Sequence, residues 1–262
     1  MSDFHSSAIV DPAALIGKSV RIGPGTVVGD AVSLGDGCEI GAHVVIEGPS
    51  KIGPGCRIFH KAVIGAEGQH TGIEGVGGGI EIGAGTVIRE MATVHRSIEE
   101  GGLTRIGEEC YLMVQAHVAH DCILGDQVIL TNATSLGGHV EIGDCTFISG
   151  FVGIHQFVRI GEGAILTGPC AVRKDVLPFT MTDGNPPRVR GLNAVGMRRI
   201  GISSKVRDNL KEIYRIIFEE SKSVEEALAR IKFKTLVGRE VASVVEFVGS
   251  SKRGFYRKAA PA

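Results

Sequence analysis

The sequence predicts a parallel β-helix of hexapeptide repeats, followed by a small α-helical C-terminal domain. The main observation is an aliphatic residue that recurs every six positions through two thirds of the chain. After the recurrence stops, apolar stripes with helical spacing follow. The composition agrees, because 38 Gly, 5% aromatic residues and no Trp fit a repetitive aliphatic core.

The six-residue period runs from Phe4 to Val172. Of the 29 positions reached by steps of six, only His70 and Glu100 are not apolar. Neither an α-helix nor an amphipathic strand has this period. In a β-helix each hexad makes one flat side and a turn, so three hexads close one coil. The apolar residue points inward and stacks on its equivalent in the next coil, about 4.8 Å away.

Two stretches, 67–79 and 97–104, lose the period, but the six-residue frame continues after each. We expect both to be loops that project from the coils, where binding residues of a rigid solenoid tend to lie. Five of the six Cys, all except Cys145, share one hexad position and are expected to be small core residues. The sequence contains no CxxC pair, so it indicates neither a metal site nor a disulfide framework. We therefore expect a reducing, cytoplasmic environment.

The repeat predicts a β-helix domain over 1–183 and a helical domain over 184–262. Pro178, Pro186 and Pro187 mark an irregular bridge between them. Ser203 or Ser204 is expected to cap a first helix, and Ser223 to Glu226 form a capping box before a second. The apolar stripes are Val206, Leu210, Ile213 and Ile217 in the first helix and Val241, Val244, Val245 and Val248 in a third.

Charge is divided between the two predicted domains. From Gly184 to the end there are 17 Lys and Arg against 8 Asp and Glu, whereas the part before Gly184 has 11 against 21. A basic module suggests an anionic partner, although a solvated helical face would give the same balance. There is no apolar run of about 18 residues and no basic start followed by an apolar segment, so we expect neither a membrane span nor a signal peptide.

Four histidines lie close together in the repeat: His117, His120, His139 and His155. Because three hexads make one coil, His120 is expected to stack beside Gly138, and Asp121 beside His139. A free N–H at a Gly turn can stabilise an oxyanion, and Asp121 can orient His120 as a general base. Together these groups are a minimal set for acyl transfer to a hydroxyl or an amine.

Other interpretations of the histidines stay open. A single histidine at a coil edge is usually a satisfied surface group, and three histidines can bind zinc, with His117 and His120 on one turn. The chain could therefore be a zinc hydratase of this fold or a scaffold without catalytic activity. Because four histidines converge, we favour catalysis and expect no metal.

Several motifs resemble those of the UDP-N-acetylglucosamine acyltransferase family of the lipid A pathway. The resemblance extends over essentially all of the chain. The motifs are His117-Val-Ala-His120-Asp121-Cys, Gly137-Gly-His139-Val, Val152-Gly-Ile-His155-Gln156-Phe157, Thr93-Val-His95-Arg96, Gly101-Gly-Leu-Thr104, Asp183-Gly-Asn-Pro186, Gly191-Leu-Asn193 and Lys252-Arg-Gly254.

The resemblance implies a left-handed coil and a homotrimer with active sites between subunits. It also implies transfer of an (R)-3-hydroxyacyl chain from acyl carrier protein to the 3-position of UDP-N-acetylglucosamine. No cofactor is expected beyond the phosphopantetheine of the carrier, and no nucleic acid partner. The acidic carrier protein would provide the anionic partner of the basic C-terminal domain.

The resemblance also assigns roles to residues. The base matches His120, assisted by Asp121, and the oxyanion donor matches the N–H of Gly138. Gly168 matches the position that limits acyl length, and a glycine there leads us to expect a long chain. The residues that match substrate contacts are His95, His117, His139, His155, Gln156, Gln69, His70, Asn193 and Arg199.

Two departures from the family pattern leave the acceptor open. The loop that commonly reads Gln-Asp-Leu-Lys is Gln69-His70-Thr71-Gly72 here, without the carboxylate and the ammonium. Arg199-Ile200 stands where many members have paired arginines. A 3-amino sugar nucleotide, which would give an amide, is therefore the alternative acceptor. The related N-acyltransferase of the same pathway carries a separate N-terminal domain, for which we expect no room because the hexads begin at Phe4.

Overall fold

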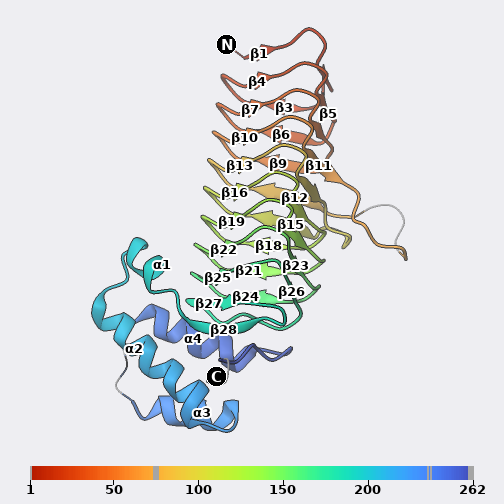
Figure 1. Ribbon diagram of the computed structural model, residues 1–262. Coiled ribbons are helices and arrows are strands. Elements are labelled where there is room, and N and C mark those ends of the chain that lie inside the picture. Colours follow the sequence, from red (N-terminus) through yellow and green to blue (C-terminus); the bar gives the residue numbers. More distant parts are fainter. Residues whose placement is uncertain (1, 73–76, 235, 237, 259–262) are drawn as a thin grey trace.

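Each hexad forms one short strand and one turn in the computed structural model, which describes residues 2–72, 77–234, 236 and 238–258. The strands stack into three sheets that wrap around one axis, so the predicted parallel β-helix is confirmed (Figure 1). Sheet A contains β1 (Asp3–Phe4), β4 (Arg21–Ile22), β7 (Glu39–Ile40), β10 (Arg57–Ile58), β13 (Val87–Ile88), β16 (Tyr111–Leu112), β19 (Ile129–Leu130), β22 (Phe147–Ile148), β25 (Ile165–Leu166), β27 (Thr180–Asp183) and β28 (Arg188–Leu192). Sheet B contains β2 (Ile9–Val10), β5 (Val27–Val28), β8 (Val45–Ile46), β11 (Val63–Ala66), β14 (Thr93–His95), β17 (His117–Val118), β20 (Ser135–Leu136), β23 (Val152–Ile154) and β26 (Cys170–Val172). Sheet C contains β3 (Leu15–Ile16), β6 (Val32–Leu34), β9 (Ser50–Ile52), β12 (Gly79–Ile82), β15 (Leu103–Ile106), β18 (Ile123–Leu124), β21 (Glu141–Ile142) and β24 (Arg159–Ile160).

The register of the strands shows how the coil absorbs the two loops. Most neighbours pair three hexads apart, as Ile22 does with Ile40. Across the first loop Ile58 pairs with Ile88, and across the second Ile88 pairs with Leu112. These two offsets are five and four whole hexads, so the inward positions stay in line. Within the loops, the hexad position Val76 lies outside the described residues.

The residues at the inward hexad positions form one continuous aliphatic core. Five cysteines are buried in it, and the sixth, Cys145, is partly exposed. Four of the buried thiols also donate a hydrogen bond to a turn carbonyl of the next coil, at sulfur–oxygen distances of 3.1–3.2 Å. Cysteine at this position therefore fills space and also satisfies a buried carbonyl.

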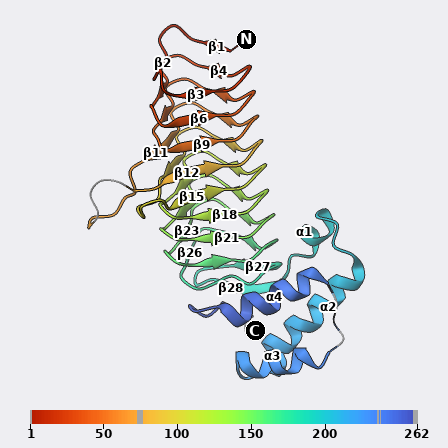
Figure 2. The same cartoon turned by 180° about the vertical axis from the view of Figure 1, so that it is seen from behind.

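The C-terminal part adds helices at the end of the solenoid opposite the N-terminus (Figure 2). These helices are α1 (Ala194–Arg199), α2 (Ser204–Arg215), the π-helical turn η1 (Ile216–Glu220), α3 (Val224–Lys232) and α4 (Arg239–Ser250). Ser203 caps α2 by accepting from the N–H of Val206, and Ser223 caps α3 by accepting from the N–H of Glu226. The carboxylate of Glu226 accepts from the N–H of Lys222, one residue before the position of an ideal capping box.

The helices share a second apolar core with the last coil. Tyr214 of α2 donates to the carbonyl of Pro178, and the buried carboxylate of Asp175 accepts from Ser251. Strand β28 pairs antiparallel with β27, so sheet A continues beyond residue 183. The division at 183/184 therefore stays a prediction. Among the described residues, no helix combines the length and the apolar character that crossing a membrane requires.

Candidate active site

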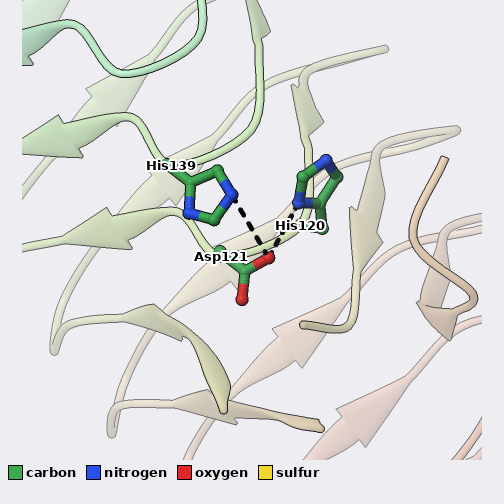
Figure 3. A group of neighbouring side chains, drawn as sticks. All are labelled: His120, Asp121 and His139. Atoms are coloured by element: carbon green, nitrogen blue, oxygen red, sulfur yellow. Dashed lines mark hydrogen bonds and ion pairs between the residues drawn. The ribbon is translucent and has the colours of Figure 1, made fainter. Parts of the chain in front are cut away.

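His120, Asp121 and His139 lie together at the corner between sheets B and C (Figure 3). His120 and Asp121 follow β17, and His139 follows β20 in the next coil. The N–H of His139 donates to the carbonyl of His120 at 3.1 Å, which ties the two turns together. The rule that three hexads make one coil therefore predicted this grouping correctly.

The imidazole of His120 is oriented by Asp121. The Nδ1 atom of His120 donates to Oδ2 of Asp121 at 2.8 Å, and both side chains are almost completely buried. This bond selects the tautomer whose other nitrogen, Nε2, has a free lone pair. This arrangement would suit a general base that is oriented by a carboxylate.

Asp121 is held in turn by a loop residue that the sequence analysis missed. Its carboxylate accepts hydrogen bonds from the hydroxyl of Ser97 and from the N–H of Ile98, and its own N–H donates to the hydroxyl of Thr104. Burial is the largest influence and would raise the pKa of Asp121, but the bonds from Ser97 and His120 outweigh it and the pKa lies below the usual value. Asp121 is therefore a carboxylate at neutral pH and can stabilise a cationic His120.

Ser97 corrects the expectation that all of 97–104 projects from the coils. Ser97 and Thr104 are fully buried, and Thr104 already belongs to β15. The register offers the signal that could have found Ser97, because Thr93 pairs with His117 at an offset of four hexads. The same offset places Ser97 beside Asp121. The first loop is also shorter than expected, because Gly79 starts β12.

Gly138 lies directly against the imidazole of His120. A Cβ atom built on Gly138 would be 2.6 Å from Nε2 of His120 and closer still to Cε1, so a side chain there would displace the imidazole. Within the described part of the chain, the N–H of Gly138 makes no hydrogen bond. At the same hexad position in four other turns, the N–H donates to a side chain one coil further on, as Glu108 does to Asp126. An unpaired N–H beside the base is suited to bind an oxyanion.

His139 completes the corner. Its ring stacks on Phe157 with centroids 4.6 Å apart and meets the ring of His120 edge-on at 5.2 Å. Its Nε2 lies 3.9 Å from Oδ2 of Asp121. The stacked ring is thus fixed where it can contact a group bound to His120.

His95 and His117 lie on the neighbouring strands β14 and β17 of sheet B, and His117 is on the strand that precedes His120. Their ring centroids are 5.3 Å apart, His117 contacts the hydroxyl of Thr93 at 2.8 Å, and His95 donates to the carbonyl of Glu67 at 2.6 Å. Burial, followed by the charge of His95, lowers the pKa of His117 to about 4. His117 is therefore neutral at pH 7 and can hydrogen-bond an uncharged hydroxyl.

The first loop brings His70 to the same corner. The ring of His70 is 6.0 Å from that of His120, and Gln69 beside it is exposed. His155 and Gln156 are exposed in the coil that follows the coil of His139, and Nδ1 of His155 lies 3.4 Å from the guanidinium of Arg253. The contact of these four residues with substrate stays a prediction.

Asn193 and Arg199 are not brought to this corner within one chain. They line a cavity of about 440 Å³ over sheet A, together with Ile129 and Phe147. The amide of Asn193 caps α1 by accepting from Gly196 and donates to the carbonyl of Gly163. Its observed role in the single chain is structural, and its contact with substrate stays a prediction.

Gly168 is in close contact with the neighbouring coil. A Cβ atom built there would lie 2.6 Å from the carbonyl oxygen of Gly150 and 2.7 Å from a methyl group of Val152. The packing of the single chain thus already requires a glycine here. The expectation that Gly168 admits a long acyl chain stays a prediction.

Comparison with known proteins identifies the family. Residues 175–256 match the family model described as the second domain of UDP-N-acetylglucosamine O-acyltransferase, and residues 13–48 match the bacterial transferase hexapeptide repeat. The acyl-[acyl-carrier-protein]–UDP-N-acetylglucosamine O-acyltransferase of Verminephrobacter eiseniae is 40% identical, over 98% of this chain and 100% of its own length. The chain belongs to this O-acyltransferase family.

Solved structures of the O-acyltransferase family have the same fold. UDP-N-acetylglucosamine O-acyltransferase from Moraxella catarrhalis matches with a TM-score of 0.93 at 36% identity, covering 97% of this chain and 99% of that one. The acyltransferase from Bacteroides fragilis matches with the same TM-score at 34% identity and the same coverage. The resemblance that was inferred from the motifs is confirmed.

Among the described residues of this O-acyltransferase, one group has the geometry to hold a metal ion. Donor atoms of His120, Asp121 and His139 all lie within 4.8 Å of one another. The pairing of His117 with His120 that the sequence suggested is not in this group, and His117 faces Thr93 instead. An ion on Asp121 would compete with the hydrogen bonds from Ser97 and His120, so these residues suit a base better than a metal.

We expect that removing metal ions leaves the turnover of the enzyme unchanged. The reason is that Nδ1 of His120 already has a carboxylate partner and needs no ion to be oriented. Turnover after dialysis against a chelator, together with metal analysis of the purified protein, measures this. Loss of activity that zinc restores would contradict it.

Proposed function

We propose that the chain transfers an (R)-3-hydroxyacyl group from acyl carrier protein to the 3-hydroxyl of UDP-N-acetylglucosamine, as a step of lipid A biosynthesis. The observation that carries the proposal is the corner where the imidazole of the His120–Asp121 pair lies against Gly138, whose N–H is unpaired among the described residues. A general base beside an oxyanion donor is what acyl transfer requires. The names of full-length relatives support the choice of donor and acceptor.

The proposed mechanism uses only groups of the chain. Nε2 of His120 takes the proton of the acceptor hydroxyl, whose oxygen attacks the thioester carbonyl. The N–H of Gly138 stabilises the resulting oxyanion, and Asp121 stabilises the cationic imidazole. When the tetrahedral intermediate collapses, the C–S bond breaks and His120 returns its proton to the carrier thiol. No metal or organic cofactor enters, apart from the phosphopantetheine of the carrier.

The three faces of the solenoid support a homotrimer. Sheet C carries charged outward residues that pair with each other, as Lys51 does with Glu81. The first four strands of sheet A also carry charged outward residues, Asp3, Arg21, Glu39 and Arg57. By contrast, the outward residues of sheet A from β13 to β25 and those of the first coils of sheet B are apolar. They are Val87, Tyr111, Ile129, Phe147 and Ile165 on sheet A, and Ile9, Val27, Val45 and Val63 on sheet B.

A closed ring of three copies, with sheet A of one against sheet B of the next, would cover apolar residues of both sheets in every copy. It would also bring the cavity that contains Asn193 and Arg199 to sheet B of a neighbour, the sheet that carries His95 and His117. A site shared between subunits explains why one chain does not unite all the residues that the family motif implies.

Features of the whole chain support the remaining parts of the proposal. The C-terminal part from Gly184 onward, with 17 basic against 8 acidic side chains, suits an acidic carrier protein. Six free cysteines suit a reducing cytoplasm. We propose no nucleic acid partner and no membrane insertion.

An assay with a 3-hydroxyacyl carrier protein and two acceptors tests the proposed function. We expect UDP-N-acetylglucosamine to be turned over faster than its 3-amino analogue. A faster reaction of the amino sugar would instead favour amide formation and make the loop of His70 and Gly72 the determinant of the acceptor. Absence of turnover with both acceptors would reject the proposed function.

A further inference from the structure

The buried thiol of Cys122 contacts the peptide group that forms the proposed oxyanion donor. Cys122 is fully buried directly after Asp121, and its Sγ atom lies 3.2 Å from the carbonyl oxygen of Gly137. Burial is the largest influence on the pKa of Cys122 and raises it to about 12. The sulfur therefore carries its proton at neutral pH and donates it to the carbonyl.

The carbonyl of Gly137 and the N–H of Gly138 belong to one peptide group. This peptide is trans, so its carbonyl and its N–H point in opposite directions. Because the carbonyl faces the buried thiol inside the coil, the N–H points away from the thiol, and the Cα atom of Gly138 that follows it lies against the imidazole of His120. The hydrogen bond from Cys122 thus fixes the orientation of this peptide group from the side opposite its N–H. A hydrogen bond to the carbonyl also polarises the N–H of the same peptide group.

A second buried thiol makes the same kind of hydrogen bond to a turn carbonyl, but there the N–H of the peptide group is already paired. Cys110 donates to the carbonyl of Gly125 at 3.1 Å, but the N–H of that peptide, which belongs to Asp126, already donates to Asp144 at 2.9 Å. The bond of Cys110 is therefore structural, whereas the peptide held by Cys122 has its N–H unpaired within the described residues at the active corner. Cys110 is a matched control for Cys122.

We propose that Cys122 is a positioning residue that fixes the Gly137–Gly138 peptide so that its N–H meets the oxyanion of the transition state. This inference rests on the proposed function. Because the bond acts on a group that only the transition state uses, its loss lowers kcat and leaves the KM for the sugar nucleotide unchanged.

The experiment compares variants that remove or keep the donor at Cys122. The fold accepts Thr and Val at this hexad position, since Thr134 and Val140 occupy it fully buried, and Thr134 makes the same bond to Ser149 at 3.2 Å. Cys122→Ala and Cys122→Val lack the donor, whereas Cys122→Thr and Cys122→Ser retain one. The change Cys110→Ala removes an equivalent thiol away from the active corner.

We expect kcat to fall about three- to tenfold in Cys122→Ala and Cys122→Val, with KM unchanged and recovery of kcat in the Thr or Ser variant. Cys110→Ala should keep the wild-type kcat. Unchanged kcat in Cys122→Ala and Cys122→Val would overturn the inference, as would an equal loss in Cys110→Ala. Failure of the wild-type enzyme to turn over either acceptor would instead reject the proposed function itself, together with this inference.

Discussion

Replacing His120 with alanine is expected to lower kcat by about 10²- to 10⁴-fold, the usual cost of losing a general base. The change removes the ring that Asp121 orients and whose free nitrogen lies beside Gly138. The inward residues of the coil stay as they are, so the fold and the KM for the sugar nucleotide should change little. Steady-state kinetics of the purified variant and its thermal unfolding measure both effects.

His60 provides a matched control for His120, because it occupies the same hexad position at a different corner of the coil. Its Nδ1 accepts from the N–H of Ala42, so His60→Ala also removes one side-chain hydrogen bond. We expect His60→Ala to retain turnover within a few-fold, with its oligomeric state checked alongside. If His120→Ala kept turnover comparable to His60→Ala, the role of His120 as base would be rejected.

Much of the site could be predicted because a regular coil turns sequence distance into spatial distance. A step of three hexads places Gly138 beside His120 and His139 beside Asp121, and both contacts are present. The inward positions followed from the six-residue period in the same way. Predicting these neighbours from the number of residues per coil requires the strand spacing but no knowledge of side-chain contacts.

The rest escaped prediction where the coil is interrupted or where distant segments meet. Ser97 reaches Asp121 through a coil that is lengthened by the second loop, so a step of three hexads misses it. Arg253 approaches His155 from the C-terminal part of the chain, for which no repeat exists. Asn193 was matched to a substrate contact, but in the single chain its amide caps α1. The hand of the coil followed from the resemblance alone, because a period of six is the same for either hand.

Gly138→Ala is the second change with a large expected effect. The alanine keeps the N–H of residue 138, but its Cβ would overlap the ring of His120, at 2.6 Å from Nε2. The imidazole must therefore move, and a displacement of about 1 Å at a reacting group can cost about 10²-fold in rate. We expect kcat to fall by about 10²-fold or more, together with a lower free energy of unfolding, both measured on the purified variant.

The double variant His120→Ala with Gly138→Ala distinguishes a clash between the new Cβ atom and the imidazole of His120 from strain in the backbone of the turn. The three heavy atoms nearest to the new Cβ all belong to the imidazole of His120, so this clash disappears when that ring is absent. Residues in contact show non-additive effects. We therefore expect Gly138→Ala to cost no further unfolding free energy when His120 is already alanine. An equal cost in both backgrounds would place the requirement for glycine in the backbone of the turn, and the proposed fit between Gly138 and the base would then be wrong.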